Sequence, residues 1–84
     1  MRYEIILQSP AEGFLNRLEK DDKIRIIEKL KDLKDNTKLG KPLTGNLTGL
    51  WSLRIEKYRA IYQVKHNELI ILILKIDHRK KIYN

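Results

Sequence analysis

The sequence predicts one α+β domain over residues 1–84, in which a helical hairpin packs on one face of a mostly antiparallel four-stranded sheet, in the order β-α-α-β-β-β. Two observations lead to this fold class. Apolar residues recur with the period of an α-helix in two successive segments before residue 34, and from residue 51 onward they alternate with the period of a β-strand. Helices that are apolar on one side must cover other apolar surface, and here the strands supply that surface.

The N-terminal elements are a strand and a helix. Residues 3–7 are rich in β-branched and aromatic side chains, which predicts a short strand. Ser9, Pro10 and Glu12 have the spacing of a capping box with proline in the first turn, in which two side chains bond backbone N–H groups at the start of a helix. An apolar stripe with helical spacing follows, made of Ala11, Phe14, Leu15 and Leu18.

A second helix and a loop come next. Asp21 and Asp22 predict the break between the helices and the N-cap of the second one, where a carboxylate meets the positive end of the helix dipole. Every third residue from Ile24 to Leu33 is apolar, and Lys, Asp and Glu occupy the other face. Two glycines and a proline between residues 36 and 46 predict a loop.

Three strands complete the predicted sheet. Residues 51–55 alternate with period two, residues 58–65 alternate less regularly, and residues 69–76 are almost wholly apolar, as in a central strand buried on both faces. Glu56 and Lys57 alone separate the first two strands, so a two-residue hairpin places Arg54 opposite Arg59. A three-residue loop at 66–68 then places Arg59 opposite Lys75.

This register gathers basic side chains on the sheet face away from the helices. That face is predicted to contain Arg54, Arg59, Lys75 and Arg79 with an apolar strip of Ile61, Ile71 and Ile73, whereas Trp51, Tyr58 and Tyr62 face the core. Like charges opposite each other across a sheet are unfavourable. An anion held by both guanidiniums would offset the repulsion, because their donors fit phosphate oxygens. The alternative is two arginines that point into water.

The charge distribution agrees with an anion-binding second half. Residues 51–84 carry eight Lys/Arg and three Asp/Glu, a net charge of +5, whereas residues 1–50 carry ten and eight, a net charge of +2. A polyanion would be attracted to the second half, and the alternative is a lysine-rich solvated surface. The chain has no cysteine and two isolated histidines, which predicts neither disulfide, metal site nor cofactor. Without a long apolar run or a signal peptide, a cytoplasmic protein with no membrane association is expected.

Four segments between residues 41 and 83 resemble motifs of the RelE/ParE toxin superfamily. They are Lys41-Pro42-Leu43-Thr44-Gly45, similar to the family's L-x-G segment; Gly49 to Ile55; Tyr58 to Val64, similar to Y-R-aliphatic-aliphatic-Y-x-aliphatic; and Asp77 to Tyr83, similar to the closing H-R-x-x-x-Y. Their order and spacing carry the resemblance, which covers essentially the whole chain. The resemblance implies the fold predicted above.

The resemblance also implies a toxin of a toxin–antitoxin module, with a choice of activities. RelE-like members are mRNA interferases, endoribonucleases that enter the ribosomal A site and cleave mRNA, whereas ParE-like members inhibit DNA gyrase and are not nucleases. The presence of both Arg79 and Tyr83 favours ribosome-dependent RNA cleavage by attack of the 2′-OH. Gyrase inhibition is the alternative, and a toxin that has lost its activity and only binds its partner is a third.

The resemblance assigns roles to individual residues. Arg59 would stabilise the charge on the phosphorane, Arg79 would contact the phosphate and its leaving oxygen, and Tyr83 would orient or deprotonate the 2′-OH. Without the resemblance, Tyr83 would be taken for a frayed terminal aromatic residue. The remaining basic positions would bind RNA: Arg54, Lys57, Lys75, Lys80 and Lys81. His78 is a reserve acid or base. Ser52 departs from the family, whose close RelE members often carry a second basic residue there.

A cognate antitoxin is the implied partner, alongside mRNA and the ribosome. An apolar strip beside a positive rim is unfavourable on a solitary protein. An antitoxin segment with apolar residues and acidic residues between them would complement it. The expected assembly is a toxin–antitoxin heterodimer, or a heterotetramer of two such pairs.

Overall fold

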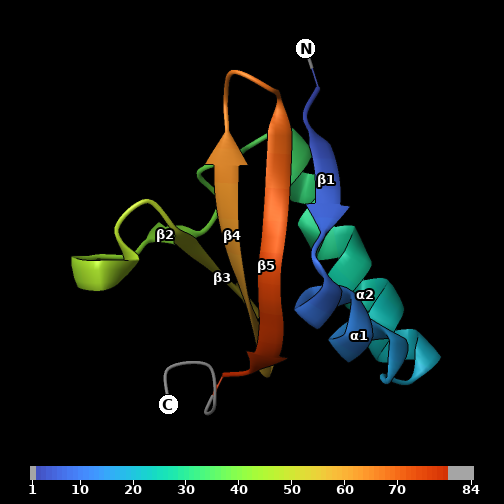
Figure 1. The fold of residues 1–84 in the computed structure, drawn as a ribbon. Helices are drawn as coiled ribbons and strands as arrows, with labels where there is room; N and C mark the ends of the chain where they lie inside the picture. The colour runs from blue at the N-terminus through green and yellow to red at the C-terminus, as the bar shows by residue number, and fades with distance from the viewer. Residues whose placement is uncertain (1, 80–84) are drawn as a thin grey trace.

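The structure is a computed structural model that describes residues 2–79 of the 84-residue chain. Its strands are β1 (Glu4–Leu7), β2 (Lys41–Pro42), β3 (Trp51–Ile55), β4 (Tyr58–Lys65) and β5 (Ile70–His78), and its α-helices are α1 (Ser9–Asn16) and α2 (Lys20–Lys31). Two short 3₁₀ helices, η1 (Asp32–Lys34) and η2 (Gly45–Leu47), lie between α2 and β3. The predicted α+β fold class is confirmed (Figure 1).

The sheet has five strands in the order β1-β5-β4-β3-β2, with β1 parallel to β5 and the other pairs antiparallel. The prediction of four strands was therefore wrong by one. The additional strand β2 lies in the segment predicted as a loop, where Lys41 pairs with Ser52 and Pro42 pairs with Trp51. A proline gives no strand signal, yet an edge strand tolerates it because one side of the strand needs no hydrogen-bond donor.

The helices begin earlier than predicted, and neither has a side-chain cap. The N-cap of α1 is Gln8, whose carbonyl accepts the Glu12 N–H at 2.9 Å, so the capping box predicted at Ser9 is wrong. The N-cap of α2 is Glu19 rather than an aspartate. Asp21 and Asp22 lie instead in the first turn of α2, where a carboxylate still stabilises the positive end of the helix.

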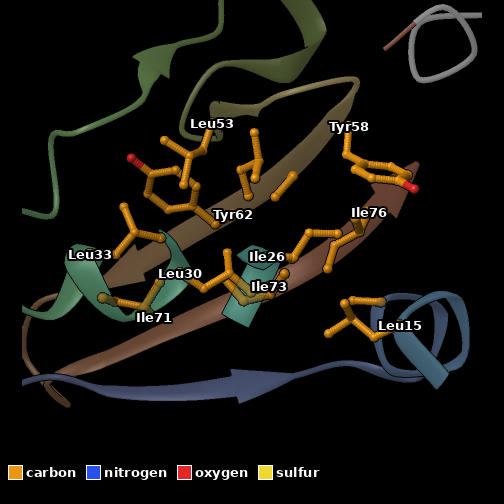
Figure 2. Packing of buried hydrophobic residues seen from close by; sticks show 13 residues of the cluster. Leu15, Ile26, Leu30, Leu33, Leu53, Tyr58, Tyr62, Ile71, Ile73 and Ile76 are labelled. Carbon is orange, nitrogen blue, oxygen red and sulfur yellow. The ribbon is translucent and has the colours of Figure 1, made fainter. Parts of the chain in front are cut away.

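The core lies between the two helices and one face of the sheet (Figure 2). Leu15 from α1 and Ile26 and Leu30 from α2 pack against alternate residues of the central strands. Tyr58 and Tyr62 are buried, which confirms their predicted place in the core. Trp51 is half-buried and stacks on Tyr62 with 6.1 Å between ring centroids. This packing fixes which face of the sheet remains uncovered.

The β3–β4 hairpin has the predicted register, whereas the β4–β5 pair does not. Four residues rather than three separate β4 from β5, and Arg59 pairs with Asp77 instead of Lys75. Tyr62 pairs with Ile73 while Ile61 pairs with Lys75, so Leu74 is the extra residue of a β-bulge. The bulge changes the alternation along β5, so that Ile71 and Ile73 face the helices before it and Ile76 faces them after it.

Because of this bulge, the predicted apolar strip of Ile61, Ile71 and Ile73 on the uncovered face is wrong. Ile71 and Ile73 are fully buried against the helices rather than placed beside the arginines. Beyond the bulge, Ile76 points into the core and Lys75 points to the uncovered face. The uncovered face therefore has Ile61 and Leu72 on its central strands and Ile6 on β1, paired with Leu72.

Candidate functional site

Two arginines and an aspartate form a row across the uncovered face of the sheet. Arg54 of β3 pairs with Arg59 of β4, and Arg59 pairs with Asp77 of β5. Cross-strand partners point to the same side of a sheet, so the three side chains share that face. Arg54 is exposed and Arg59 is half-buried. The predicted arginine pair is therefore confirmed as a pair, with Lys75 exposed on the same face beside Ile61.

A hollow of about 450 Å³ lies where this face meets the outer edge of β3. Four cationic side chains from four elements line it: Lys29 of α2, Lys41 of β2, Arg54 of β3 and Arg59 of β4. The other described residues of its wall are uncharged, so none of them is acidic. We call it the cationic hollow. A concave site with walls of one charge concentrates ions of the opposite charge, and this one is suited to anions.

A buried tyrosine holds the wall of the cationic hollow in place. The Tyr62 hydroxyl donates to the Thr37 carbonyl at 2.9 Å and accepts the Gly40 N–H at 3.0 Å. Burial raises the pKa of Tyr62 above its ordinary value, against a smaller opposing effect of the Gly40 N–H. Gly40 lies so close to β3 that a Cβ there would be 2.6 Å from the Ser52 carbonyl oxygen. The segment leading to Lys41 is thus fixed against the sheet.

A second charged cluster connects α2 to the β3–β4 turn on the other side of Arg54. The Tyr58 hydroxyl donates to the Asp22 carboxylate at 2.9 Å. Arg25 forms two ion pairs, with its Nη2 2.5 Å from Oδ1 of Asp22 and its Nε 3.4 Å from Oε2 of Glu56. We call Asp22, Arg25, Glu56 and Tyr58 the turn network. The hydrogen bond from Tyr58, followed by that from Arg25, lowers the pKa of Asp22. Burial and then the Asp22 carboxylate raise the pKa of Tyr58.

The structure brings some of the predicted site residues together and separates others. The Arg79 N–H donates to the Lys57 carbonyl at 2.9 Å, so Arg79 lies at the end of the sheet that carries the β3–β4 turn. The Nζ of Lys57 lies 5.6 Å from the centroid of the Tyr58 ring, a core residue. Lys57 is therefore close to the helix side rather than beside the arginine pair.

His78 faces the helices, away from Arg54 and Arg59. Its ring packs 5.2 Å from that of Tyr58 and 5.9 Å from that of Phe14, measured between centroids. A role as reserve acid or base beside the arginine pair is not compatible with this position. Tyr83, Lys80 and Lys81 lie outside the described residues.

Two residues of the cationic hollow were missed by the sequence analysis. Lys29 was counted with the solvated face of the second helix, and Lys41 with a loop. The one signal for Lys41 was its place at the start of the Lys41-Pro42-Leu43-Thr44-Gly45 segment. For Lys29 there was none, because its approach to the edge of β3 depends on how α2 packs.

Residues 2–79 offer no group of three or more His, Cys, Asp or Glu side chains that could hold a metal ion. None of the helices in that range has the length and apolar character needed to cross a bilayer.

Comparison with known proteins gives consistent matches. Residues 5–83 match the family model of the ParE toxin of the type II toxin–antitoxin system parDE. The curated Toxin RelG of Mycobacterium tuberculosis is 39% identical over 46 residues, which are 55% of this chain and 53% of that protein, so the match spans about half of the curated relative.

Two solved structures resemble the whole fold. The toxin–antitoxin complex RelBE2 of Mycobacterium tuberculosis contains a chain with a TM-score of 0.85 and 28% identity, covering 94% of this chain and 100% of that one. The archaeal RelE–RelB complex of Pyrococcus horikoshii contains one with a TM-score of 0.77 and 26% identity, covering 96% and 99%. The two helices and the mostly antiparallel sheet are thus shared with toxins from a bacterium and an archaeon.

Proposed function

Because the chain belongs to the ParE toxin family, within the RelE/ParE superfamily of toxins from type II toxin–antitoxin modules, we propose that it is a ribosome-dependent endoribonuclease that cleaves mRNA in the A site. The observation that carries this proposal is the Arg54–Arg59 pair in the wall of the cationic hollow. Two guanidiniums that would repel each other are stabilised by an anion between them, and a phosphodiester fits their planar donors.

The half-buried Arg59 is suited to stabilise the transition state. In the reaction the 2′-oxygen forms a bond to phosphorus, the bond from phosphorus to the 5′-oxygen breaks, the 2′ proton leaves and the 5′-oxygen gains a proton. Negative charge builds up on the phosphorane, and a donor in a partly desolvated position stabilises it more than one in bulk water. Arg59 has this position, whereas the exposed Arg54 is accessible to an incoming RNA strand.

Proton transfer is assigned to Tyr83, with Arg79 contacting the phosphate and its leaving oxygen. His78 is not proposed for it, because that ring packs against Phe14 and Tyr58 on the opposite face. The arginine row also contains Asp77, and its carboxylate accepts a hydrogen bond from the backbone N–H of His78 at 2.7 Å. The chain thus offers no strong acid–base pair next to Arg59 within its described part, which is the reason to expect a requirement for the ribosome.

We further propose that a cognate antitoxin with an acidic segment binds this toxin, because the two solved relatives are toxin–antitoxin complexes. The segment would lie on the uncovered sheet face, where Ile6, Ile61 and Leu72 adjoin Lys75 and Arg59. A heterodimer, or a heterotetramer of two such pairs, is the expected assembly. Action on ribosomes would place the toxin in the cytoplasm.

Mapping of mRNA ends after induction in a bacterial host tests the proposed activity. New 5′ ends inside translated reading frames are expected from the wild-type chain, and none after induction of Arg59→Ala. Growth arrest with intact mRNA would contradict RNA cleavage. Inhibited supercoiling by purified gyrase would then support the alternative function, inhibition of DNA gyrase. We retain this alternative because the matching family model is that of the ParE toxin. Expression of the wild type without growth arrest would indicate a toxin that only binds its partner.

A further inference from the structure

The cationic hollow extends well beyond the arginine pair, to two lysines with no assigned role. Lys29 is half-buried on α2, and Lys41 is exposed on β2. Both line the same 450 Å³ space as Arg54 and Arg59, a volume within the range of about 300–1,000 Å³ typical of ligand pockets. The hollow thus brings two further cations to the space that the arginine pair lines.

The charge of the hollow is unbalanced, unlike that of its neighbour. A second hollow on the other side of Arg54, between α2 and the β3–β4 turn, shares Lys29 and Arg54 with the first. That second hollow includes Glu28, Asp32 and Glu56, which balance its three cations. An anion that reaches Arg54 is therefore attracted toward Lys41 and Arg59 and repelled by the carboxylates on the other side.

The four cations converge only through the tertiary fold. Each comes from a different element, and the Tyr62 hydrogen bonds to Thr37 and Gly40 fix the segment that precedes Lys41. Within residues 2–79, neither Lys29 nor Lys41 takes part in an ion pair. Holding four positive groups around one space is unfavourable unless an anion enters it.

We propose that Lys29 and Lys41 bind phosphates of the substrate strand that flank the scissile phosphate, so that the RNA crosses the edge of β3 from Arg59 toward α2. This inference rests on the proposed function, which places the scissile phosphate at Arg59. It assigns a phosphate-binding role to one residue of a helix and one of an edge strand. The acidic residues of the neighbouring hollow mark the side that the strand does not enter.

The test is the salt dependence of binding to a short 2′-O-methyl RNA oligonucleotide, measured with the full-length chain by fluorescence anisotropy. The 2′-O-methyl groups remove the nucleophile, so binding is read without cleavage. Each phosphate contact on a single strand contributes about 0.7 to the slope of log K against log salt concentration. Lys29→Ala and Lys41→Ala should each reduce the slope by about 0.7, and Lys29→Arg and Lys41→Arg should retain it.

Lys31→Ala is the matched control, because Lys31 is an exposed lysine of the same helix and lies outside the hollow. The Lys→Gln variants repeat the measurement if an alanine variant does not fold. Wild-type slopes in Lys29→Ala and Lys41→Ala would overturn the inference whether or not the protein cleaves mRNA, as would a wild-type chain that does not bind the oligonucleotide. If Lys29→Ala and Lys41→Ala lose binding to an acidic antitoxin peptide but keep the wild-type slope with RNA, the hollow binds the antitoxin instead. Reduced slopes without any mRNA cleavage would retain the phosphate contacts and reject the proposed enzyme.

Discussion

The two charged regions that adjoin Arg54 use the same residue types in opposite ways. In the turn network, Arg25 lies between two carboxylates, and Asp22 also accepts a hydrogen bond from Tyr58. In the cationic hollow, four cations line one space and its described wall contains no acid. Opposite charges connect two elements of the fold, whereas a wall lined by charges of one sign provides a place for a ligand. The difference comes from placement, since Lys and Arg are plentiful throughout the chain.

Substitutions should therefore have different consequences in the two regions. Solvent and salt screen the ion pairs of the turn network, so each contributes little, and the loss of one should reduce the free energy of unfolding only slightly. Removing a cation from the hollow relieves repulsion among the four, so the fold should not be destabilised, whereas ligand binding or catalysis should be lost. Activity and the free energy of unfolding must both be measured to separate these outcomes.

Arg59→Ala should cause the largest effect on activity. Removal of one donor that stabilises charge in a transition state typically reduces the rate by about 10²–10³, or roughly 3–4 kcal/mol. Cleavage of mRNA in a reconstituted translation mixture is the measurement, with Lys31→Ala as a control that should retain the wild-type rate. The melting temperature of Arg59→Ala should stay close to that of the wild type. A folded Arg59→Ala variant that cleaves mRNA at the wild-type rate would contradict the proposed role.

Gly40→Ala should destabilise the wall of the hollow. A Cβ at this position would lie 2.6 Å from the Ser52 carbonyl oxygen and 2.9 Å from the Tyr62 hydroxyl. The segment that leads to Lys41 would therefore have to move away from β3. Overpacking of this kind costs about 1–3 kcal/mol. Chemical denaturation measures the loss.

Gly13→Ala is the matched control for Gly40→Ala. In α1 the new Cβ would meet only Arg17, at 3.5 Å, and alanine favours a helix over glycine by about 0.8–1.0 kcal/mol. The two substitutions should therefore change the free energy of unfolding in opposite directions. Equal stabilities of the two variants would show that the close approach at Gly40 does not matter.

The sequence predicted the Arg54–Arg59 pair but not the space around it, for a physical reason. The two-residue turn at Glu56 and Lys57 and the alternation on both sides of it fix the hairpin register locally. The cationic hollow depends on contacts between segments distant in sequence, such as the Tyr62 hydrogen bonds that position the chain before Lys41. No local pattern contains that information.

The bulge in β5 shows a second limit. Residues 69–76 are apolar at both parities, so the sequence does not indicate which of them face the helices. The predicted three-residue loop at 66–68 also placed Lys75 outside the core. The protein does so with a longer loop and an extra residue at Leu74, which buries Ile71 and Ile73 as well. The same outward position of Lys75 thus arose from a different register.

The smallest expected effect is the pH dependence of the turn network. The pKa of Asp22 is lowered in the folded protein, chiefly by the Tyr58 hydroxyl and then by Arg25. A carboxyl group with a depressed pKa stabilises the fold above the ordinary aspartate pKa of about 3.9, and this contribution is lost as the pH falls through the lower pKa of the folded state. Asp22→Asn should therefore be less stable than the wild type at neutral pH, and the difference should shrink below about pH 4.

Tyr58 gives the corresponding effect at alkaline pH. Its pKa is raised by burial and by the Asp22 carboxylate, so the unfolded chain ionises first and stability should fall as the pH rises above about 10. Tyr62, whose pKa burial also raises, should still produce part of this fall in Tyr58→Phe. Urea denaturation of wild type, Asp22→Asn and Tyr58→Phe across the pH range measures the loss of stability at acidic and at alkaline pH. A difference between wild type and Asp22→Asn that is the same at acidic and neutral pH would mean that Asp22 stabilises the turn through its shape rather than through its charge.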